Sequence, residues 1–285
     1  MAAFPQKPAV NRTVFLIGKP LGHSLSPVMQ NAAFRALGMR TYYAPLELEP
    51  GQLPGFFTAF KSVNVVGANV TVPYKEKVLG RLDRVEKDAA WLGSVNTLYK
   101  KQGAVWGAST DGEGFLLSLG RRRAALRGSS GVLLGAGGAA RSVAGALAGS
   151  GVKRLMIANR SPDRARRLGR ALIRRFPRME VGMVSIAEAE KLLPRMDWVV
   201  QATSLGLEPG DPSPMSLRGA GNSLWVADLV YHRTTAFLSQ ARRRRLWALG
   251  GVGMLLHQGA LAFEKWTGQR APLSVMRSAL LAGLR

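Results

Sequence analysis

The chain has 285 residues, contains no cysteine, and carries 40 Lys and Arg against 17 Asp and Glu, a net charge of +23 at pH 7. This length suits two domains of about 150 residues each, and it is long enough to bury a substantial core. Without cysteine there are no disulfides and no cysteine metal sites, and His23, His232 and His257 lack metal-ligand spacing. No apolar run approaches the roughly 18 residues of a membrane helix, and Met1–Arg12 lacks a signal-peptide core, so we expect a cytoplasmic protein.

Much of the excess positive charge is arginine, gathered at 121–123, 164–178 and 242–245. Such a surface attracts nucleic acids non-specifically, and it also attracts small anionic substrates. The clusters lack interleaved aromatic residues and match no nucleic-acid-binding motif, so we interpret them as solvated helix faces with no specific nucleic-acid partner. A nucleotide-sensing or nucleic-acid-binding protein stays open as the alternative from a different class.

Strand and helix patterns alternate along residues 1–112. The predicted strands are 13–17, 42–48 and 67–72, and the predicted helices are 27–37 and 52–61. Residues 95–99 and 104–106 are typical of a hairpin around Gln102-Gly103.

Residues 113–253 form a second block of β–α units, and residues 254–285 have a helical pattern. The strands predicted in the second block are 131–134, 154–158, 197–203 and 224–228. Parallel strands joined by helices predict an α/β fold, with a doubly wound domain in each half.

The segment Gly22-His23-Ser24-Leu25-Ser26-Pro27 joins the first predicted strand to the first predicted helix. Ser26 suits the N-cap position and Pro27 the first helical position, which accounts for both residues structurally. It does not account for Ser24. Two hydroxyls beside a helix N-terminus can bind a carboxylate or phosphate, and capping alone remains the alternative.

Lys75 ends the stretch 67–75, where a predicted strand enters a predicted helix. In the first helical turn its charge would oppose the helix dipole, so an anionic neighbour and acid/base chemistry are indicated. The alternative is an ordinary surface lysine, because Glu76 and Lys77 follow.

Asp111 falls at the boundary between the two blocks, where a cleft between domains would form. A loop aspartate is more often a turn former or a helix cap, and Gly112 beside it supports that plainer interpretation.

The apolar run 131–134 leads directly into Gly135-Ala136-Gly137-Gly138-Ala139-Ala140-Arg141, and the predicted strand 154–158 follows. Strand, glycine turn, helix and second strand are the context that the dinucleotide-binding fingerprint requires. Gly135 allows the tight turn, and Gly137 lets the backbone approach a pyrophosphate. Ala140 permits close packing of the helix on the strand, while the helix N-terminus offers its amides to the phosphates.

The end of the second strand indicates which dinucleotide is bound. Sites for NAD usually have Asp or Glu there, to bind the ribose 2′-hydroxyl, but this chain has Asn159-Arg160-Ser161, with Arg164 close behind. A guanidinium pairs with a 2′-phosphate through charge-assisted hydrogen bonds, so the sequence favours NADP. The alternative is that these arginines belong to the solvated basic face that continues to Arg170.

Together these motifs resemble the shikimate dehydrogenase family, NADP-dependent enzymes of the aromatic pathway, from about Phe15 to Pro272. The motifs are HSLSP (23–27), GANVTVPYK (67–75), VNT (95–97), STDG (109–112), GAGGAAR (135–141), NRS (159–161), ATSLG (202–206) and GMLLHQGA (253–260). The resemblance implies reversible NADPH-dependent reduction of 3-dehydroshikimate to shikimate, with no metal. It also implies that 113–253 is a Rossmann-type NADP domain and that the helices of 254–285 return to complete the 1–112 substrate domain. The composition suits either a monomer or a homodimer.

The resemblance also implies a role for each matching residue. Lys75 is the implied acid/base residue, with Asp111 paired to it. The implied substrate ligands are Ser24 and Ser26 for the carboxylate, Thr71, Asn96 and Gln258 for the ring hydroxyls, and Tyr231 near the carboxylate. The implied cofactor-site residues are Gly135, Gly137, Gly138, Ala139, Arg141, Asn159, Arg160, Ser161, Arg164, Thr203 and Ser204, with Gly251 and Met254 near the nicotinamide.

Three positions depart from the family pattern: Ser94 stands where Ala is usual, Ser109 where Asn is usual, and Gly250 where Asp is frequent. None replaces an implied catalytic group, and no fused dehydratase domain is expected. A quinate/shikimate dehydrogenase, often NAD-using, or an aminoshikimate-type paralogue remains the alternative enzyme.

Overall fold

The computed structural model describes residues 11–62 and 64–284, which divide into two compact units. The first unit holds the described residues up to Glu86, with Val95–Ala108 and the chain from Gly259 onward; the second holds Lys87–Ser94 and Ser109–Gln258. Both are built from strands and helices in alternation, so the predicted α/β class is confirmed. No helix within the described ranges is long and apolar enough to cross a membrane.

The first unit contains a six-stranded sheet in the order β2-β1-β3-β5-β6-β4. Its strands are β1 (Arg12–Gly18), β2 (Thr41–Glu47), β3 (Val65–Val70), β4 (Arg84–Val85), β5 (Thr97–Lys101) and β6 (Ala104–Ala108). Its complete helices are α1 (Ser26–Ala36), α2 (Leu53–Phe60) and α10 (Leu273–Gly283).

The sheet of the first unit is mixed rather than wholly parallel, because the predicted hairpin joins it. β1 pairs in parallel with β2 and β3, whereas β5 runs antiparallel to both β3 and β6. The two-residue turn between β5 and β6 has positive φ at Gln102 (52°) and Gly103 (75°), the backbone that a tight hairpin turn requires.

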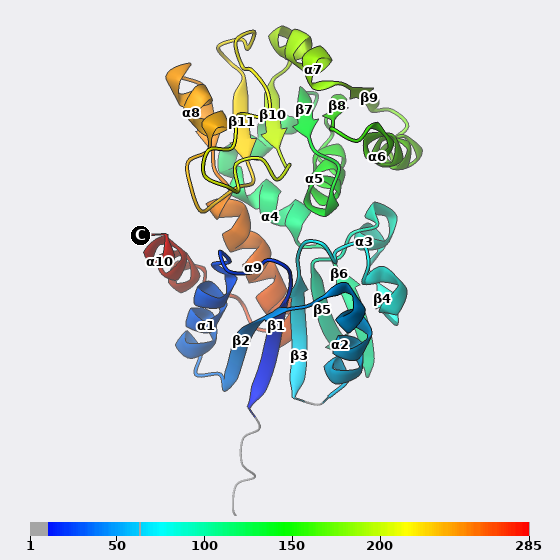
Figure 1. The fold of residues 1–285 in the computed structure, drawn as a ribbon, viewed down its shortest axis with the longest axis vertical. Helices are drawn as coiled ribbons and strands as arrows, with labels where there is room; N and C mark the ends of the chain where they lie inside the picture. The colour runs from blue at the N-terminus through cyan, green and yellow to red at the C-terminus, as the bar shows by residue number, and fades with distance from the viewer. Residues whose placement is uncertain (1–10, 63, 285) are drawn as a thin grey trace, which may run out of the picture. The chain divides into compact units, whose positions relative to one another are not determined.

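Aromatic side chains hold the helices of the first unit in place. Phe56 of α2 meets Phe15 of β1 edge-on, with ring centroids 6.1 Å apart. Phe34 of α1 lies 5.0 Å from Phe263, which belongs to α9 (Val252–Thr267). α10 lies beside α1 (Figure 1), so the last helix of the chain packs in the same unit as the N-terminal sheet.

The second unit contains a parallel sheet in the order β12-β11-β10-β7-β8-β9, which reverses between β7 and β10 as in dinucleotide-binding folds. The strands are β7 (Ser130–Leu134), β8 (Arg154–Ala158), β9 (Glu180–Val184), β10 (Trp198–Gln201), β11 (Trp225–Asp228) and β12 (Trp247–Leu249). The helices are α3 (Lys87–Leu92), α4 (Asp111–Ser118), α5 (Gly138–Gly149), α6 (Pro162–Arg175), α7 (Ile186–Leu192) and α8 (Ala236–Arg243), and α9 begins here. The sequence did not predict the edge strands β9 and β12, which are short and only partly buried.

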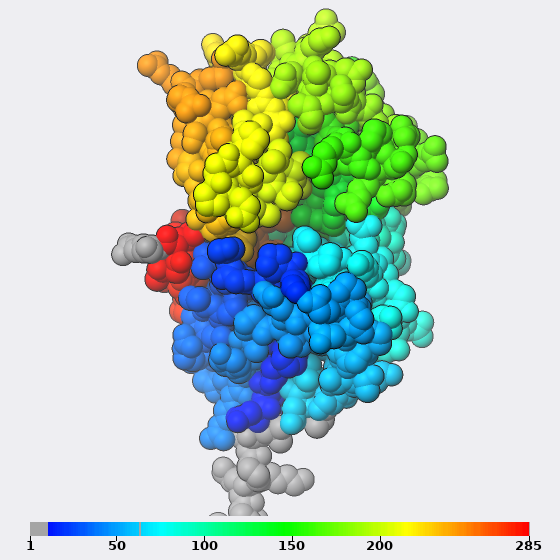
Figure 2. Space-filling view, in the orientation of Figure 1, coloured from blue at the N-terminus to red at the C-terminus, as the bar shows by residue number. Residues whose placement is uncertain are grey.

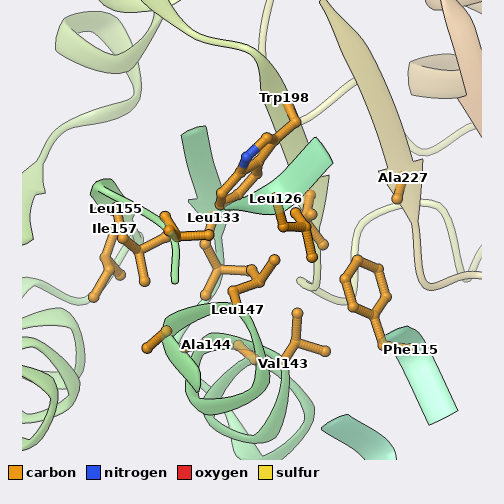
Figure 3. Close-up of a cluster of buried hydrophobic side chains, with 14 of the residues drawn as sticks. Phe115, Leu126, Leu133, Val143, Ala144, Leu147, Leu155, Ile157, Trp198 and Ala227 are labelled. Carbon is orange, nitrogen blue, oxygen red and sulfur yellow. The ribbon is translucent and has the colours of Figure 1, made fainter. Parts of the chain in front are cut away.

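The core of the second unit has a layer of side chains on each face of the sheet. On one face, Val143, Ala144 and Leu147 of α5 point toward Leu133 and Trp198 of the sheet (Figure 3). Residues of α7 and α8 cover the other face. The segment between β10 and β11, coloured yellow, lies over the side of this unit that faces the viewer (Figure 2). Both faces of the sheet are therefore buried, and the ends of its strands carry the loops of the site.

Candidate active site

Two predicted substrate residues and the predicted acid/base residue lie near the carboxyl end of β3 in the first unit. Thr71 directly follows β3, whose last amide, that of Val70, donates to the carbonyl oxygen of Asn96 over 2.8 Å. The Val95 amide donates to the carbonyl oxygen of Lys75 over 2.9 Å. Thr71, Lys75 and Asn96 are therefore held on neighbouring segments of one unit.

Lys75 is not in a helix, and the sequence prediction was wrong here. Residues 72–78 form successive turns, and only the three-residue 3-10 helix Leu79–Arg81 follows. The reason lies in tertiary contacts: the Lys75 carbonyl, which a helix would bond to its own next turn, accepts the Val95 amide instead. The buried Tyr74 side chain also donates to the carbonyl oxygen of Leu48 and fixes the turn. No helix dipole therefore acts on Lys75, and the chemistry of its ammonium depends on its neighbours.

Asn96 is held by a buried polar network that the sequence analysis missed. Its side chain is 3% exposed and accepts a hydrogen bond from the Thr97 hydroxyl over 2.9 Å. The backbone carbonyl oxygen of Asn96 accepts a hydrogen bond from the Asn69 side-chain nitrogen over 3.0 Å. The Asn69 side-chain oxygen in turn accepts one from the Tyr43 hydroxyl over 2.9 Å. An asparagine inside the apolar strand 65–70 was the sequence signal for this network.

The two serines after β1 differ from the sequence prediction, which gave the capping role to Ser26. α1 begins at Ser26 itself, with Leu25 at the N-cap position, so the predicted Ser26 cap is wrong by one residue. The Ser24 Oγ instead accepts the Ser26 amide over 3.3 Å. Ser24 thus acquires a local structural role, and its hydroxyl hydrogen is left to donate to a ligand.

Asp111 is the first residue of α4 and is 4% exposed. Gly112 beside it does not form a turn: a Cβ there would lie 2.5 Å from the carbonyl oxygen of Ser142 in α5. Glycine is therefore needed for close approach of two helices, and the interpretation of Asp111-Gly112 as turn formers was wrong. Asp111 belongs to the second unit, whereas Lys75 belongs to the first.

The glycine turn after β7 has the geometry that a pyrophosphate requires. Gly135 has φ +112°, and a Cβ there would lie 2.8 Å from the carbonyl oxygen of Ala202 and 3.2 Å from the Thr203 amide. The turn is thus packed against the loop after β10. Gly137 is the N-cap residue of α5 and offers no capping side chain, and a Cβ at Gly137 would meet no described atom within 4 Å. This open backbone at a helix N-terminus fits the phosphates of NADP.

Two of the departures from the family pattern stabilise this helix N-terminus. The Ser94 hydroxyl donates to the carbonyl oxygen of Gly138 over 3.1 Å, and the Ser142 hydroxyl donates to the same oxygen over 3.2 Å. The Ser109 hydroxyl lies 2.7 Å from that of Ser142. The unusual serines therefore form one hydrogen-bonded group under the first turn of α5.

Arg141 of α5 is directed toward α3. Its Nη1 donates to the carbonyl oxygen of Leu92 over 3.0 Å, and its buried Nε has no hydrogen-bond partner among the described residues. The guanidinium is thus partly engaged in joining two helices of the same unit.

Within the described chain, the end of β8 carries exposed cations and no free carboxylate. Asn159 donates from its side-chain nitrogen to the carbonyl oxygen of Ser161 over 2.8 Å, which shapes the loop, and Arg160 and Arg164 are exposed. Asp163, the nearest acid, is 2.6 Å from the Arg166 guanidinium, whose hydrogen bond holds the pKa of Asp163 below its usual value. The local charge therefore suits a 2′-phosphate.

The remaining predicted residues follow β10 and β11 or lie on α9. The Thr203 hydroxyl accepts the Leu205 amide over 3.2 Å, and Ser204 is exposed in the same loop. Tyr231 lies between β11 and α8, with its ring edge-on to His232 at 5.7 Å. Met254 is buried in the core cluster with α5.

Gln258 and Gly251 are both on or beside the first half of α9. The Gln258 side chain donates to the carbonyl oxygen of Leu255 over 2.8 Å. A Cβ added at Gly114 would lie 2.6 Å from the backbone nitrogen of Gln258, so α4 and α9 approach closely there. A side chain is also excluded at Gly251, because a Cβ added there would lie 2.2 Å from the Leu229 carbonyl oxygen. Within the described ranges, no three His, Cys, Asp or Glu side chains gather as metal ligands would.

Comparison with family models finds three matches along the chain. Residues 16–98 match the shikimate dehydrogenase substrate binding domain, 118–207 match shikimate/quinate 5-dehydrogenase, and 251–281 match the shikimate 5'-dehydrogenase C-terminal domain.

Relatives of known name are similar over nearly the whole length. The shikimate dehydrogenase (NADP(+)) of Methanopyrus kandleri is 42% identical, with 97% of each chain covered. The crystal structure of shikimate 5-dehydrogenase from Thermus thermophilus in complex with NADP(H) and shikimate matches with a TM-score of 0.84 and 33% identity, covering 95% of this chain and 99% of that one. Quinate dehydrogenase from Corynebacterium glutamicum in complex with NAD matches with a TM-score of 0.87 and 31% identity, covering 95% and 99%.

Proposed function

The chain belongs to the shikimate dehydrogenase family, and we propose that it catalyses the reversible NADPH-dependent reduction of 3-dehydroshikimate to shikimate, a step of chorismate biosynthesis. One observation carries the proposal: Thr71, Lys75 and Asn96 are grouped at the carboxyl end of β3, in a chain whose second sheet carries a complete dinucleotide turn. The first feature offers a proton donor beside hydrogen-bonding ligands for a polyhydroxylated ring. The second offers a backbone site for a dinucleotide.

Proton transfer is assigned to Lys75. When bound, NADPH supplies the hydride that reduces the ring carbonyl. The Lys75 ammonium donates its proton to the carbonyl oxygen as that oxygen gains negative charge, and the resulting amine recovers a proton from water. Asp111 is assigned as the partner that orients Lys75. In the oxidative direction the same amine removes the hydroxyl proton.

Substrate binding is assigned to six residues. Ser24 and Ser26 bind the substrate carboxylate, and hydroxyl groups are the donors that such an anion requires. Thr71, Asn96 and Gln258 bind the ring hydroxyls, and Tyr231 reaches the carboxylate region. The buried network behind Asn96 fixes the direction of its amide, and hence the stereochemistry that it recognises.

Cofactor binding is assigned to the second unit. The residues are Gly135, Gly137, Gly138, Ala139, Arg141, Asn159, Arg160, Ser161, Arg164, Thr203, Ser204, Gly251 and Met254. The glycines bind the pyrophosphate through backbone amides, and Arg160 and Arg164 bind the 2′-phosphate.

We further infer a cytoplasmic enzyme, monomeric or homodimeric, with no specific nucleic-acid partner. In the part of the chain that the structure describes, the arginines of α6 and of 242–245 are largely exposed, which agrees with solvated basic helix faces.

The proposal is tested by following NADPH absorbance while the purified protein oxidises shikimate or quinate with NADP or NAD. We expect the largest kcat/KM for shikimate with NADP. Faster turnover of quinate with NAD would identify the quinate-type paralogue instead, and turnover of neither acid with either cofactor would overturn the proposal.

A further inference from the structure

Asp228 is a buried acid that the proposed chemistry does not use. It is the last residue of β11, and its side chain is 1% exposed. Burial raises the pKa of its carboxyl to about 6, against hydrogen bonds from Thr235 and Val230 that lower it, so the group is mainly charged at neutral pH. A buried charge opposes folding unless it is hydrogen-bonded, and acids with strongly shifted pKa values cluster at functional sites.

The Asp228 carboxylate closes the loop that carries Tyr231. One oxygen accepts the Val230 amide over 3.0 Å, and the other accepts the Thr235 hydroxyl over 2.6 Å. Thr235 is also the N-cap of α8, because its Oγ1 accepts the Leu238 amide over 3.1 Å. Both ends of the 229–235 loop are thus fixed to one carboxylate.

The same contact continues to the start of α9. The Gly251 amide donates to the carbonyl oxygen of Val230 over 3.0 Å. Val230 therefore binds Asp228 through its amide and Gly251 through its carbonyl oxygen. Gly251 immediately precedes α9, which carries Met254 and Gln258. A chain of hydrogen bonds therefore runs from Thr235 through Asp228 and Val230 to Gly251.

A second connection joins this loop to the loop after β10. A Cβ at Gly206, whose φ is +97°, would lie 2.6 Å from the Thr235 Cγ2 atom. A His232 ring nitrogen lies 2.9 Å from the carbonyl oxygen of Leu207. The loop with Thr203 and Ser204 is thus packed against the loop that Asp228 closes.

We propose that Asp228 is a positioning residue of the reaction: its carboxylate sets the geometry of the Tyr231 loop and of the amino end of α9, so that substrate and nicotinamide ligands are aligned together. This inference rests on the proposed function for the roles of Tyr231, Gly251, Met254 and Gln258. It assigns no direct contact between Asp228 and a ligand.

The test compares Asp228→Asn with Asp197→Asn. Asp197 also accepts a backbone amide, that of Ser130 over 2.8 Å, but it precedes β10 at the opposite, amino end of the same sheet. For Asp228→Asn we expect kcat/KM for shikimate to fall on the order of 10- to 100-fold, the usual effect of slightly misplaced ligands, with a melting temperature close to the parent at neutral pH. Asp197→Asn should keep the parent kcat/KM.

Hydrogen–deuterium exchange on the ligand-free protein supplies a readout independent of turnover. In Asp228→Asn, peptides that cover 229–235 and 250–254 should exchange faster, whereas peptides of β7 should not change. An activity loss that merely follows the unfolded fraction, or unchanged exchange in the two loops, would overturn the inference.

Thr235 keeps the inference testable if Asp228→Asn does not fold. Thr235→Val removes the hydroxyl that donates to Asp228, and Thr235→Ser retains it. We expect the valine variant to lose kcat/KM and the serine variant to recover most of it; equal activities would overturn the inference. A parent protein that oxidises no shikimate would refute the proposed function, whereas an active parent with an equally active Asp228→Asn would refute only this role.

Discussion

The Ser94 hydroxyl donates a hydrogen bond to the carbonyl oxygen of Gly138, 44 positions later in the chain, over 3.1 Å. This bond attaches the segment after α3 to the first residue of α5, the helix to which we assign pyrophosphate binding.

Ser94→Ala should therefore lower the free energy of unfolding by about 1 kcal/mol, the usual net value of one such bond, with a modest rise in KM for NADP. Ser150→Ala is the matched control, because Ser150 donates to the Ala146 carbonyl at the other end of α5. Urea unfolding and initial rates measure both effects. An equal rise in KM for the two variants would mean that the bond at Gly138 has no specific effect on the cofactor site.

Lys75→Ala should lower kcat by roughly 10²- to 10⁴-fold, the range for loss of a general acid–base group, with a smaller change in shikimate affinity. Asp111→Asn should also reduce kcat, and the double variant should lose less than the product of the two effects, because the residues act as a unit. Lys77→Ala, which removes an exposed lysine two positions away, is the control. Near-normal turnover in Lys75→Ala would exclude Lys75 as the proton donor.

Ser24→Ala should raise the KM for shikimate by about 10-fold or more, since a hydrogen bond to a charged group is worth about 1.5–3 kcal/mol. The Ser26 amide also loses its local acceptor in this variant. The methyl ester of shikimate separates the two effects, because it lacks the charge but needs the same loop. A carboxylate contact predicts a larger loss for the acid than for the ester, and equal losses would indicate a purely structural role.

Arg160→Ala should reduce kcat/KM for NADP by about 10- to 100-fold and leave that for NAD nearly unchanged, because only NADP carries the 2′-phosphate. Arg164→Ala should have the same sign. Arg170→Ala removes another exposed arginine from α6, the helix that carries Arg164, and should change neither constant. A parent enzyme that used NAD as well as NADP would contradict the assignment of both arginines.

The raised pKa of Asp228 predicts a pH dependence of stability. Because this pKa is about 6 in the fold, above the roughly 3.9 of an unfolded chain, the folded state alone holds the proton between those values. This group therefore stabilises the fold most at low pH, and its contribution is lost as pH rises toward 6, by up to about 3 kcal/mol.

Asp228→Asn abolishes that titration. The variant should become more stable relative to the parent as the pH rises from about 4 to about 7.5, because only the parent loses stability over this range. Urea unfolding at both pH values measures the two free energies of unfolding. Parallel pH curves for parent and variant would show that Asp228 does not titrate in this range.

Local pattern alone determined much of this protein. The apolar run 154–158 predicted β8 with both ends correct, and the Gln102-Gly103 pair predicted the hairpin turn whose positive φ values the structure shows. The glycine turn, and an arginine in place of an acid at the end of β8, indicated an NADP site. These features depend on the periodicity of apolar residues and on the backbone freedom of single residues such as glycine. Both can be recognised from neighbouring positions in the sequence.

The tertiary structure decided the features that depend on partners distant in the chain. Lys75 lies in a turn because the Val95 amide binds its carbonyl, and Gly112 is required because the carbonyl of Ser142 packs against it. The closure of the Tyr231 loop by Asp228 was likewise not predicted. The bonds of Thr235 to Asp228 and of Gly251 to Val230 form only when the chain has folded. Backbone donors and acceptors must be satisfied somewhere, and which residue satisfies them is set by packing rather than by local sequence.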